Sequence, residues 1–207
     1  MELLDSPIRD YAWGSRSVLA ELQGRPAPSP GPEAELWIGA HPASPSTVRR
    51  KDGPVELPHL IAGAPHEWLG ADVTARYGAR LPFLLKVLAV EAPLSLQAHP
   101  DAERAARRFA LGDANYVDAY HKPELLVAIA PFEALCGFRQ PQRSAAVLDA
   151  LGLGEVAAHL RRGTAGLADA VRLLLETPGD SAVARAVSAD PPPGLADDQD
   201  LARRLAE

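Results

Sequence analysis

Short apolar runs separated by turn formers characterise the first part of the chain. Up to about residue 58 the runs include Glu35-Leu36-Trp37-Ile38-Gly39, and Pro- and Gly-rich stretches such as residues 26–32 bound them. Residues 81–90 are apolar almost throughout, and residues 93–100 form a further apolar run. Runs of this length between turn residues predict strands. We therefore predict short strands and loops, followed by two longer core strands.

Residues 57–77 show a different pattern, with apolar residues at mixed helical spacings. Gly63, Pro65 and Gly70 interrupt this pattern, and each of them disfavours a continuous helix. We predict short helices at most in this stretch.

A stronger helix signal follows at residues 102–111, which are good helix formers. Asp101 precedes them, and its carboxylate can accept a hydrogen bond from an unpaired backbone N–H at the helix start. We predict a helix that Asp101 caps and that ends at Gly112. Residues 123–130 and 132–138 then return to a composition typical of strands.

The composition changes at residue 141, after which Ala, Leu, Arg and Asp dominate. Apolar residues recur at helical intervals in four stretches, 144–151, 156–160, 167–175 and 197–207. We predict two domains, a β-rich one over residues 1–140 and a helical one over residues 141–207. The last amphipathic stretch runs to the final residue, so we expect the helical domain to be truncated.

Charge and cysteine content narrow the classes of function. Lys plus Arg total 21 against 27 Asp plus Glu, and the net charge of −6 argues against a nucleic-acid binder that relies on a basic surface. The single Cys136 excludes an intrachain disulfide framework and fits a reducing compartment. No leader-like start is present, and no apolar run reaches the ~18 residues of a membrane span. We expect a soluble, cytoplasmic protein without nucleic-acid or membrane partners.

Two potential metal ligands, Gln97 and His99, stand two residues apart in the second predicted core strand. Their side chains would leave the same face of a strand, as would that of Ser95. Taken alone, the Gln97–His99 pair is better explained as a hydrogen-bonded polar strand edge. Glu124 changes this balance, because it lies in the cluster His121-Lys122-Pro123-Glu124-Leu125, which is costly to place beside apolar strands without a function. Imidazole, carboxylate and amide oxygen together suit zinc or a similar divalent ion.

Five segments, in order along the chain, resemble the motifs of the type I mannose-6-phosphate isomerases. They are Tyr11-Ala12-Trp13-Gly14, Glu35-Leu36-Trp37-Ile38-Gly39-Ala40-His41-Pro42, Leu85-Lys86-Val87-Leu88, Leu94-Ser95-Leu96-Gln97-Ala98-His99-Pro100 and His121-Lys122-Pro123-Glu124-Leu125. With Pro131-Phe132-Glu133-Ala134-Leu135-Cys136-Gly137-Phe138, they cover most of residues 7–140.

The resemblance implies a β-rich, cupin-type (jelly-roll) barrel with an inserted or appended α-helical domain. It also implies one zinc ion, held by the residues that match Gln97, His99 and Glu124. Family members continue through the rest of the barrel, which carries a fourth zinc ligand, a histidine that has no counterpart in this sequence. We therefore expect an incomplete barrel and self-association through exposed barrel edges. For the chain by itself we expect weak zinc retention and negligible conversion of mannose 6-phosphate.

The implied reaction interconverts mannose 6-phosphate and fructose 6-phosphate, so the implied partner is a small phosphosugar. By resemblance, His121 is the candidate for opening the sugar ring. Lys86 or Lys122 is the candidate for proton transfer between C1 and C2, or for stabilising the enediolate charge. Trp13 and Glu35 resemble pocket residues that face the sugar, and Ser95 is a further substrate-binding candidate.

Each of these roles has a purely structural alternative. Lys86 would otherwise extend its ammonium to solvent from a strand edge, and His121 would cap a turn or hydrogen-bond within a loop. Trp13 would simply pack against its neighbours, and Glu35 would pair with a surface cation.

Several other residues stand out less clearly. Asp10 and His41 are further pocket-lining candidates, whereas Trp37 and Cys136 stand in apolar strand contexts and are predicted to be core residues. The basic runs at residues 49–51 and 161–162 could bind phosphate, although such runs are usually solvated surface.

Three functions compete. The leading hypothesis is the zinc-dependent aldose–ketose isomerase. A non-catalytic metal- or sugar-binding cupin module is the alternative, because ligands can be retained when turnover is lost. Another cupin enzyme, such as a metal-dependent oxygenase, is a third, since fold alone does not fix function. Cupin oxygenases usually rely on several histidines around iron, so the ligand set of this chain favours the isomerase.

Overall fold

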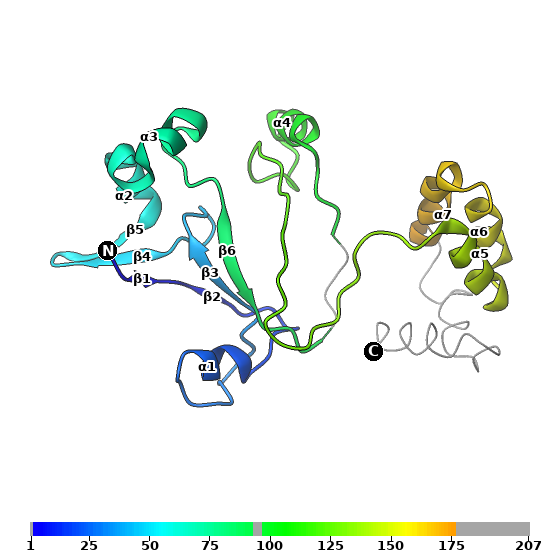
Figure 1. Ribbon diagram of the computed structural model, residues 1–207, viewed down its shortest axis with the longest axis horizontal. Coiled ribbons are helices and arrows are strands. Elements are labelled where there is room, and N and C mark those ends of the chain that lie inside the picture. Colours follow the sequence, from blue (N-terminus) through cyan, green and yellow to red (C-terminus); the bar gives the residue numbers. More distant parts are fainter. Residues whose placement is uncertain (1, 93–96, 177–207) are drawn as a thin grey trace. The chain divides into compact units, whose positions relative to one another are not determined.

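The chain divides into two compact units, Met1–Leu96 (the N-terminal unit) and Gln97–Glu207 (the C-terminal unit). The computed structural model describes residues 2–92 and 97–176 (Figure 1). Each unit has a hydrophobic core of its own, around Leu19 and Leu36 in the first and around Ala157 and Leu160 in the second. In the described residues, no helix is long and apolar enough to cross a membrane.

One antiparallel sheet of the N-terminal unit has the strand order β2-β3-β6. It consists of β2 (Ile8–Arg9), β3 (Glu35–Gly39) and β6 (Leu84–Leu88), as predicted for the two apolar runs that β3 and β6 occupy. Trp37 of β3 lies opposite Lys86 of β6. Because successive side chains of a strand point to opposite faces, this sheet has two chemically different faces.

The apolar face of this sheet forms the core of the unit. Leu36 packs there against Leu19, which belongs to the short helix α1 (Val18–Leu22), and against Ala89. Three partly buried residues complete this cluster, namely Ile8, Ile38 and Val87. The other face carries Glu35 and Trp37 together with the side chains opposite them on the neighbouring strands.

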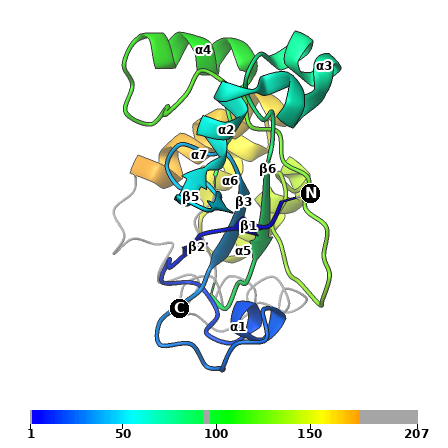
Figure 2. The same cartoon turned by 90° about the vertical axis from the view of Figure 1, so that its left-hand side faces the viewer.

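A second antiparallel sheet has the order β1-β4-β5, formed by β1 (Leu4–Asp5), β4 (Thr47–Arg50) and β5 (Gly53–Glu56). Helices α2 (Leu57–Gly63) and α3 (Pro65–Tyr77) follow it directly. They lie at the opposite end of the N-terminal unit from α1 (Figures 1 and 2).

The predicted interruptions of residues 57–77 are confirmed. Ala64 separates α2 from α3, and α3 itself is kinked at Gly70, whose φ of 79° and ψ of 165° are not helical. A positive φ of this size is readily adopted only by glycine, which explains why the helix breaks at this residue.

The first helix of the C-terminal unit is α4 (Ala102–Ala110), and its predicted ends are confirmed. The backbone N–H of Arg104 donates to Asp101 Oδ1 at 2.7 Å, so Asp101 is the cap. Gly112, with φ of 71°, lies just beyond the last turn.

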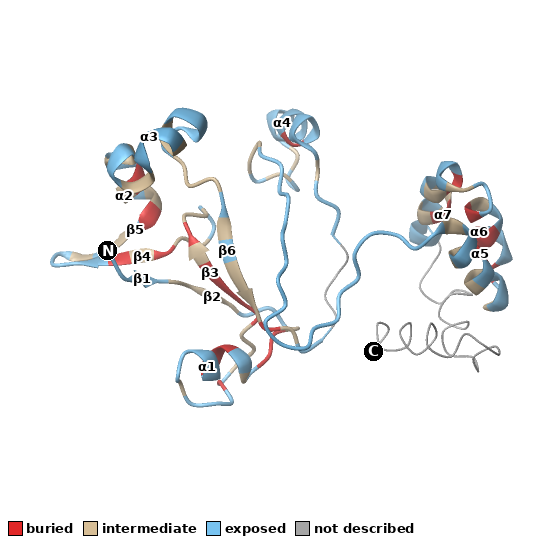
Figure 3. Cartoon of the chain, viewed as in Figure 1, coloured by how far each residue is buried: buried red, intermediate tan, exposed pale blue. Residues whose placement is uncertain are grey.

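Residues 121–140 form no strand, so the predictions of strands at 123–130 and 132–138 are wrong. All residues of this segment are exposed (Figure 3), with Leu125 at 91% and Ile129 at 83%. A strand is held by hydrogen bonds to a neighbouring strand, and the described residues provide no partner for this segment. Its apolar composition therefore does not lead to a sheet.

The second predicted core strand, residues 93–100, is wrong over the part that the structure describes. Residues 97–100 have no regular structure, so Gln97 and His99 do not stand on a strand. Residues 2–92 and 97–176 contain two small antiparallel sheets and helices but no closed barrel.

Three helices follow in the C-terminal unit, α5 (Pro141–Ala150), α6 (Gly154–Leu160) and α7 (Thr164–Glu176). Their buried residues form one cluster, namely Ala145, Val156, Ala157, Leu160 and Ala170. The helical interpretation is thus confirmed up to residue 176, whereas the stretch at 197–207 lies outside the described residues. The domain boundary at residue 140 stays a prediction.

Candidate active site

The polar face of the β2-β3-β6 sheet holds a nearly buried carboxylate, that of Glu35, which is only 7% exposed. The indole N–H of Trp37 donates to Glu35 Oε2 at 2.6 Å, and Lys86 Nζ lies 3.5 Å from the same oxygen. A carboxylate removed from water is costly unless it is paired and hydrogen-bonded. Strand β3 places Glu35 two residues before Trp37, and the register of β6 brings Lys86 across from Trp37.

The ring of Trp37 connects this carboxylate to nearby cations. Lys86 Nζ lies 4.8 Å from the ring centre, and the guanidinium carbon of Arg9 lies 5.4 Å from it. His41 packs its ring edge against Trp37 at a centroid distance of 4.9 Å. An aromatic face attracts cations at such distances, so two positive charges gather beside Glu35.

This arrangement can bind and stabilise negative charge on a substrate. The ammonium of Lys86 is held by Glu35 and the Trp37 ring, with 30% of its side chain still exposed. A cation fixed in advance can stabilise an enediolate without reorganising when the charge develops. Together, Glu35 and Lys86 also offer one acceptor and one donor of protons at a single place.

Trp13, a predicted substrate-binding residue, is partly buried and stacks on Tyr11 at a centroid distance of 5.7 Å. Its carbonyl accepts hydrogen bonds from the backbone N–H groups of Glu91 and Ala92, at 3.0 and 3.3 Å. The next residue, Gly14, has no room for a side chain, because a Cβ there would lie 2.5 Å from the backbone nitrogen of Ala34. The loop that carries Trp13 is therefore tied closely to the sheet.

The predicted metal ligands belong to the C-terminal unit. His99 Nδ1 lies 3.9 Å from Glu124 Oε2, whereas two donors that each stand ~2.1 Å from a tetrahedral zinc lie ~3.4 Å apart. This pair therefore suits zinc in donor type and nearly in spacing. Gln97 is exposed in the irregular segment before His99.

Within residues 2–92 and 97–176, no group of three or more His, Cys, Asp and Glu side chains could hold a metal ion. The ligand roles of Gln97, His99 and Glu124 stay predictions, and Ser95 lies outside the described residues.

His121 and Lys122 are exposed in the irregular segment that leads to Glu124. Lys122 Nζ forms an ion pair with Asp118 Oδ2 at 3.8 Å. Their catalytic roles also stay predictions.

The two residues assigned to the core differ in outcome. Trp37 is buried as predicted, at 8% exposure, whereas Cys136 is exposed, so its assignment is wrong. The error has the same cause as the wrong strand at residues 132–138, because an apolar segment without partner strands is not covered. Asp10 is exposed, and His41 Nδ1 accepts a hydrogen bond from the Ala43 N–H at 3.1 Å.

The arginines of the basic runs are paired with carboxylates. Arg49 donates to Asp5 at 2.6 and 3.1 Å, and Arg50 donates to Glu2 at 2.7 Å. In the C-terminal unit, Arg161 forms an ion pair with Asp149, and Arg162 pairs with Asp169 at 3.2 Å.

The sequence interpretation missed the contacts that Arg9 and Trp37 make on the polar face. The signal for Trp37 was its position two residues after Glu35, because period-two alternation places both side chains on one strand face. No comparable local signal identifies Arg9, whose place beside Trp37 depends on the pairing of β2 with β3.

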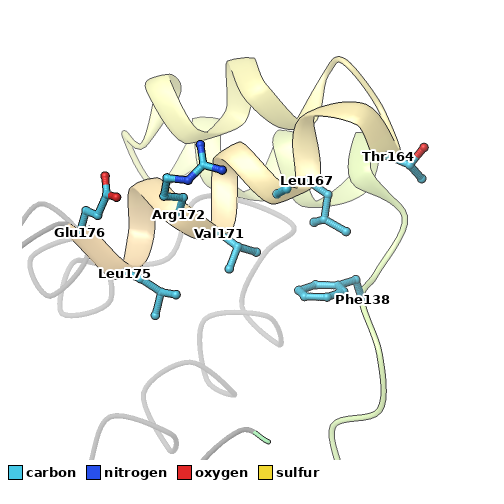
Figure 4. A pocket seen from close by; sticks show the side chains of 8 residues that line it. Phe138, Thr164, Leu167, Val171, Arg172, Leu175 and Glu176 are labelled. Carbon is cyan, nitrogen blue, oxygen red and sulfur yellow. The ribbon is translucent and has the colours of Figure 1, made fainter. Parts of the chain in front are cut away.

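The C-terminal unit has a groove along α7, which Leu167, Val171 and Leu175 line together with Phe138 (Figure 4). Its lining is mainly apolar, with Arg172 and Glu176 also contributing. None of the predicted site residues lines it, so we do not assign the reaction to this groove.

Comparisons with known proteins agree on one family. The model of the phosphomannose isomerase type I catalytic domain matches residues 1–141. The mannose-6-phosphate isomerase of Escherichia coli is 42% identical over 151 residues, which are 68% of this chain and 38% of that protein. The human mannose-6-phosphate isomerase is 39% identical over 145 residues, covering 66% of this chain and 34% of the human protein.

Solved structures give the same result. A mutant of phosphomannose isomerase from Salmonella typhimurium superposes with a TM-score of 0.84 and 32% identity, over 100% of this chain and 56% of that chain. A mannose 6-phosphate isomerase bound with zinc and yttrium gives a TM-score of 0.81 and 32% identity, with the same two coverages. The chain thus spans between about a third and just over half of the length of these relatives. The match over residues 1–141 shows that the chain belongs to the phosphomannose isomerase type I family.

Proposed function

We propose that this chain contributes to the active site of a zinc-dependent isomerase that interconverts mannose 6-phosphate and fructose 6-phosphate. The observation that carries the proposal is the polar sheet face, where Glu35, Trp37 and Lys86 are in mutual contact within the segment that matches the family's catalytic domain. The proposed substrate, a small phosphosugar, is inferred from the names of the relatives.

In this proposal the open-chain sugar lies against the polar sheet face, with Trp13 and Glu35 as its contacts. Lys86 stabilises the negative charge of the enediolate, and Lys86 or Lys122 carries the proton between C1 and C2. His121 opens the sugar ring, and Ser95 adds a hydrogen bond to the substrate. The cytoplasm, where phosphosugars are metabolised, is the proposed location.

Gln97, His99 and Glu124 are the proposed zinc ligands. Support comes from the closeness of His99 to Glu124 and from the similarity to a solved mannose 6-phosphate isomerase that is bound with zinc. A bound zinc supplies Lewis acidity toward sugar oxygens. The side chains of His99 and Glu124 keep their donor atoms close together, which favours a common ion between them.

A non-catalytic metal- or sugar-binding module is the second candidate. It is favoured by the finding that residues 2–92 and 97–176 contain no group of three or more His, Cys, Asp and Glu side chains that could hold a metal ion. A site with few such ligands can still bind a sugar without turning it over.

A chimaera tests the proposed function. Residues 1–141 replace the matching segment of the Escherichia coli enzyme, and a coupled assay follows the formation of fructose 6-phosphate. We expect a zinc-containing, active isomerase. His99→Ala should remove both zinc and activity, whereas His66→Ala, at an exposed position of α3, should change neither. A folded, zinc-loaded chimaera that binds the sugar phosphate without converting it would favour the non-catalytic module.

A further inference from the structure

Trp37 contacts both members of the Glu35–Lys86 pair on the polar face of the sheet. Its indole N–H, a donor without acceptor capacity, bonds to Glu35 Oε2 at 2.6 Å. Its ring lies under the ammonium of Lys86, 4.8 Å from the ring centre. The direct contact between Lys86 Nζ and Glu35 Oε2 is longer, at 3.5 Å, so Trp37 makes the tighter connection to the carboxylate.

The main chain of Trp37 is itself held firmly. Its N–H donates to the Pro7 carbonyl at 2.9 Å, and its carbonyl accepts a hydrogen bond from Ser46 Oγ at 3.3 Å. Ser46 is fully buried, and its hydroxyl also accepts from the Gly39 N–H and bonds to the hydroxyl of Ser6. A side chain with two rotatable bonds on such a fixed backbone has little freedom to move.

We propose that Trp37 is a positioning residue, which holds the Glu35 carboxylate with its N–H and the Lys86 ammonium with its ring. The catalytic importance of the Glu35–Lys86 pair rests on the proposed function, but the contacts of Trp37 with both residues are independent of it. Because a hydrogen bond to a carboxylate is stronger than one to a neutral acceptor, the indole N–H holds the Glu35 carboxylate in place. Lys86 then points to a defined place above the sheet instead of sampling solvent.

The indole signals of the 207-residue chain test the contact directly. The chain has three tryptophans, so a nitrogen–proton correlation spectrum contains three indole signals, and Trp37→Phe identifies that of Trp37. We expect Glu35→Gln, which leaves a neutral acceptor, to move the Trp37 signal upfield and to leave those of Trp13 and Trp68 in place. Trp68→Phe is the matched control, because Trp68 lies beside the guanidinium of Arg50 much as Trp37 lies beside that of Arg9. An unchanged Trp37 signal in Glu35→Gln would overturn the proposal.

Kinetics of the chimaera test the consequence. Trp37→Phe keeps an aromatic ring but loses the N–H. We expect kcat to fall by about 10- to 100-fold, because a small misplacement of reacting groups lowers the rate by this order, while KM stays within about twofold. Trp68→Phe should leave both constants unchanged. Wild-type kcat in Trp37→Phe would overturn the positioning role even if the spectrum shows the contact. An inactive parent chimaera would count against the proposed function alone, and the spectrum would then decide for or against the contact.

Discussion

At the residue scale, Lys86 combines a place in an apolar strand with a charged side chain that contacts other polar-face residues. It interrupts the apolar strand β6, and its ammonium turns to Glu35 and the ring of Trp37. The alternative of a side chain extended to solvent does not describe it, since 70% of the side chain is covered (30% exposed). A cation in this position can stabilise substrate charge, which a solvated lysine does weakly.

Lys86→Ala in the chimaera separates a catalytic from a structural role. We expect kcat to fall by at least about 100-fold, because a preorganised charge acts on the transition state. Zinc content, measured by atomic absorption, should stay the same, since Lys86 is no metal ligand. Arg107→Ala, which removes an exposed cation of α4, is the control. Parallel losses of zinc and activity would instead make Lys86 a structural residue.

At the scale of elements, local signals predicted helix ends well. The cap of α4 and the kink of α3 both follow from single residues, Asp101 and Gly70, whose chemistry acts within one turn. Local signals predicted strands less well. The apolar segment at residues 121–140 has a composition typical of strands, but no strand of the described residues pairs with it.

Removal of the α4 cap gives an element-scale prediction. Asp101→Ala should destabilise the start of α4 by about 1 kcal/mol, because the N–H of Arg104 loses its acceptor. Hydrogen exchange of the amides at residues 102–105 should accelerate about fivefold, as that free energy implies. Asp101→Asn keeps an acceptor and should exchange nearly as slowly as the wild type. Equal exchange in the alanine and wild-type chains would contradict the cap.

The contact between α6 and α7 gives a second prediction at the scale of elements. Gly166 is buried, and a Cβ there would collide with the carbonyl oxygen of His159. Gly166→Ala should therefore force the helices apart and destabilise this helical bundle by about 1–3 kcal/mol. Thermal unfolding followed by circular dichroism measures the effect, with Ala165→Ser at the exposed neighbouring position as the control. A wild-type melting temperature for Gly166→Ala would show that the helices adjust freely.

At the scale of the whole molecule, acid sensitivity follows from two aspartates. A hydrogen bond from Arg49 lowers the pKa of Asp5, and one from the Asn115 backbone N–H lowers the pKa of Asp113. A carboxyl whose pKa is lower in the folded state stabilises the fold above its unfolded pKa of ~3.9, and this contribution disappears as the pH falls through the folded value.

We therefore expect the melting temperature of the chain to fall as the pH is lowered from ~5 to below ~3.5. Asp113→Asn removes one titrating group, so its melting temperature should depend less steeply on pH over this range. Calorimetry at several pH values measures both curves, and curves that stay parallel would exclude a contribution from Asp113.

The exposed apolar residues of 121–140 predict self-association. Leu125 and Ile129 are 91% and 83% exposed, and contiguous apolar surface of this kind tends to be covered by another molecule. Sedimentation velocity should show oligomers that grow with protein concentration. The double change Leu125→Ser and Ile129→Ser should reduce them, whereas Leu3→Ser, at an equally exposed residue outside the segment, should not. A monomer at all concentrations would contradict this expectation.

The sequence by itself determined what depends on neighbours along the chain. It predicted the ends of α4, the interruptions of residues 57–77, the helices up to residue 176 and the family, because caps, breakers, periodicity and motifs are local. Only the tertiary structure decided which apolar segments became strands, since a strand requires hydrogen bonds from residues distant in sequence.

The dependence of strand pairing on residues distant in sequence also explains which parts of the site could be predicted and which could not. Glu35 and Lys86 could be identified from their motifs, whereas the place of Arg9 depends on the register of β2 against β3. The apolar strand context of Trp37 predicts a core residue, and it is buried as expected. Its bond to Glu35 and its contact with Lys86 arise only when β3 and β6 pair, because pairing decides which side chains share a face.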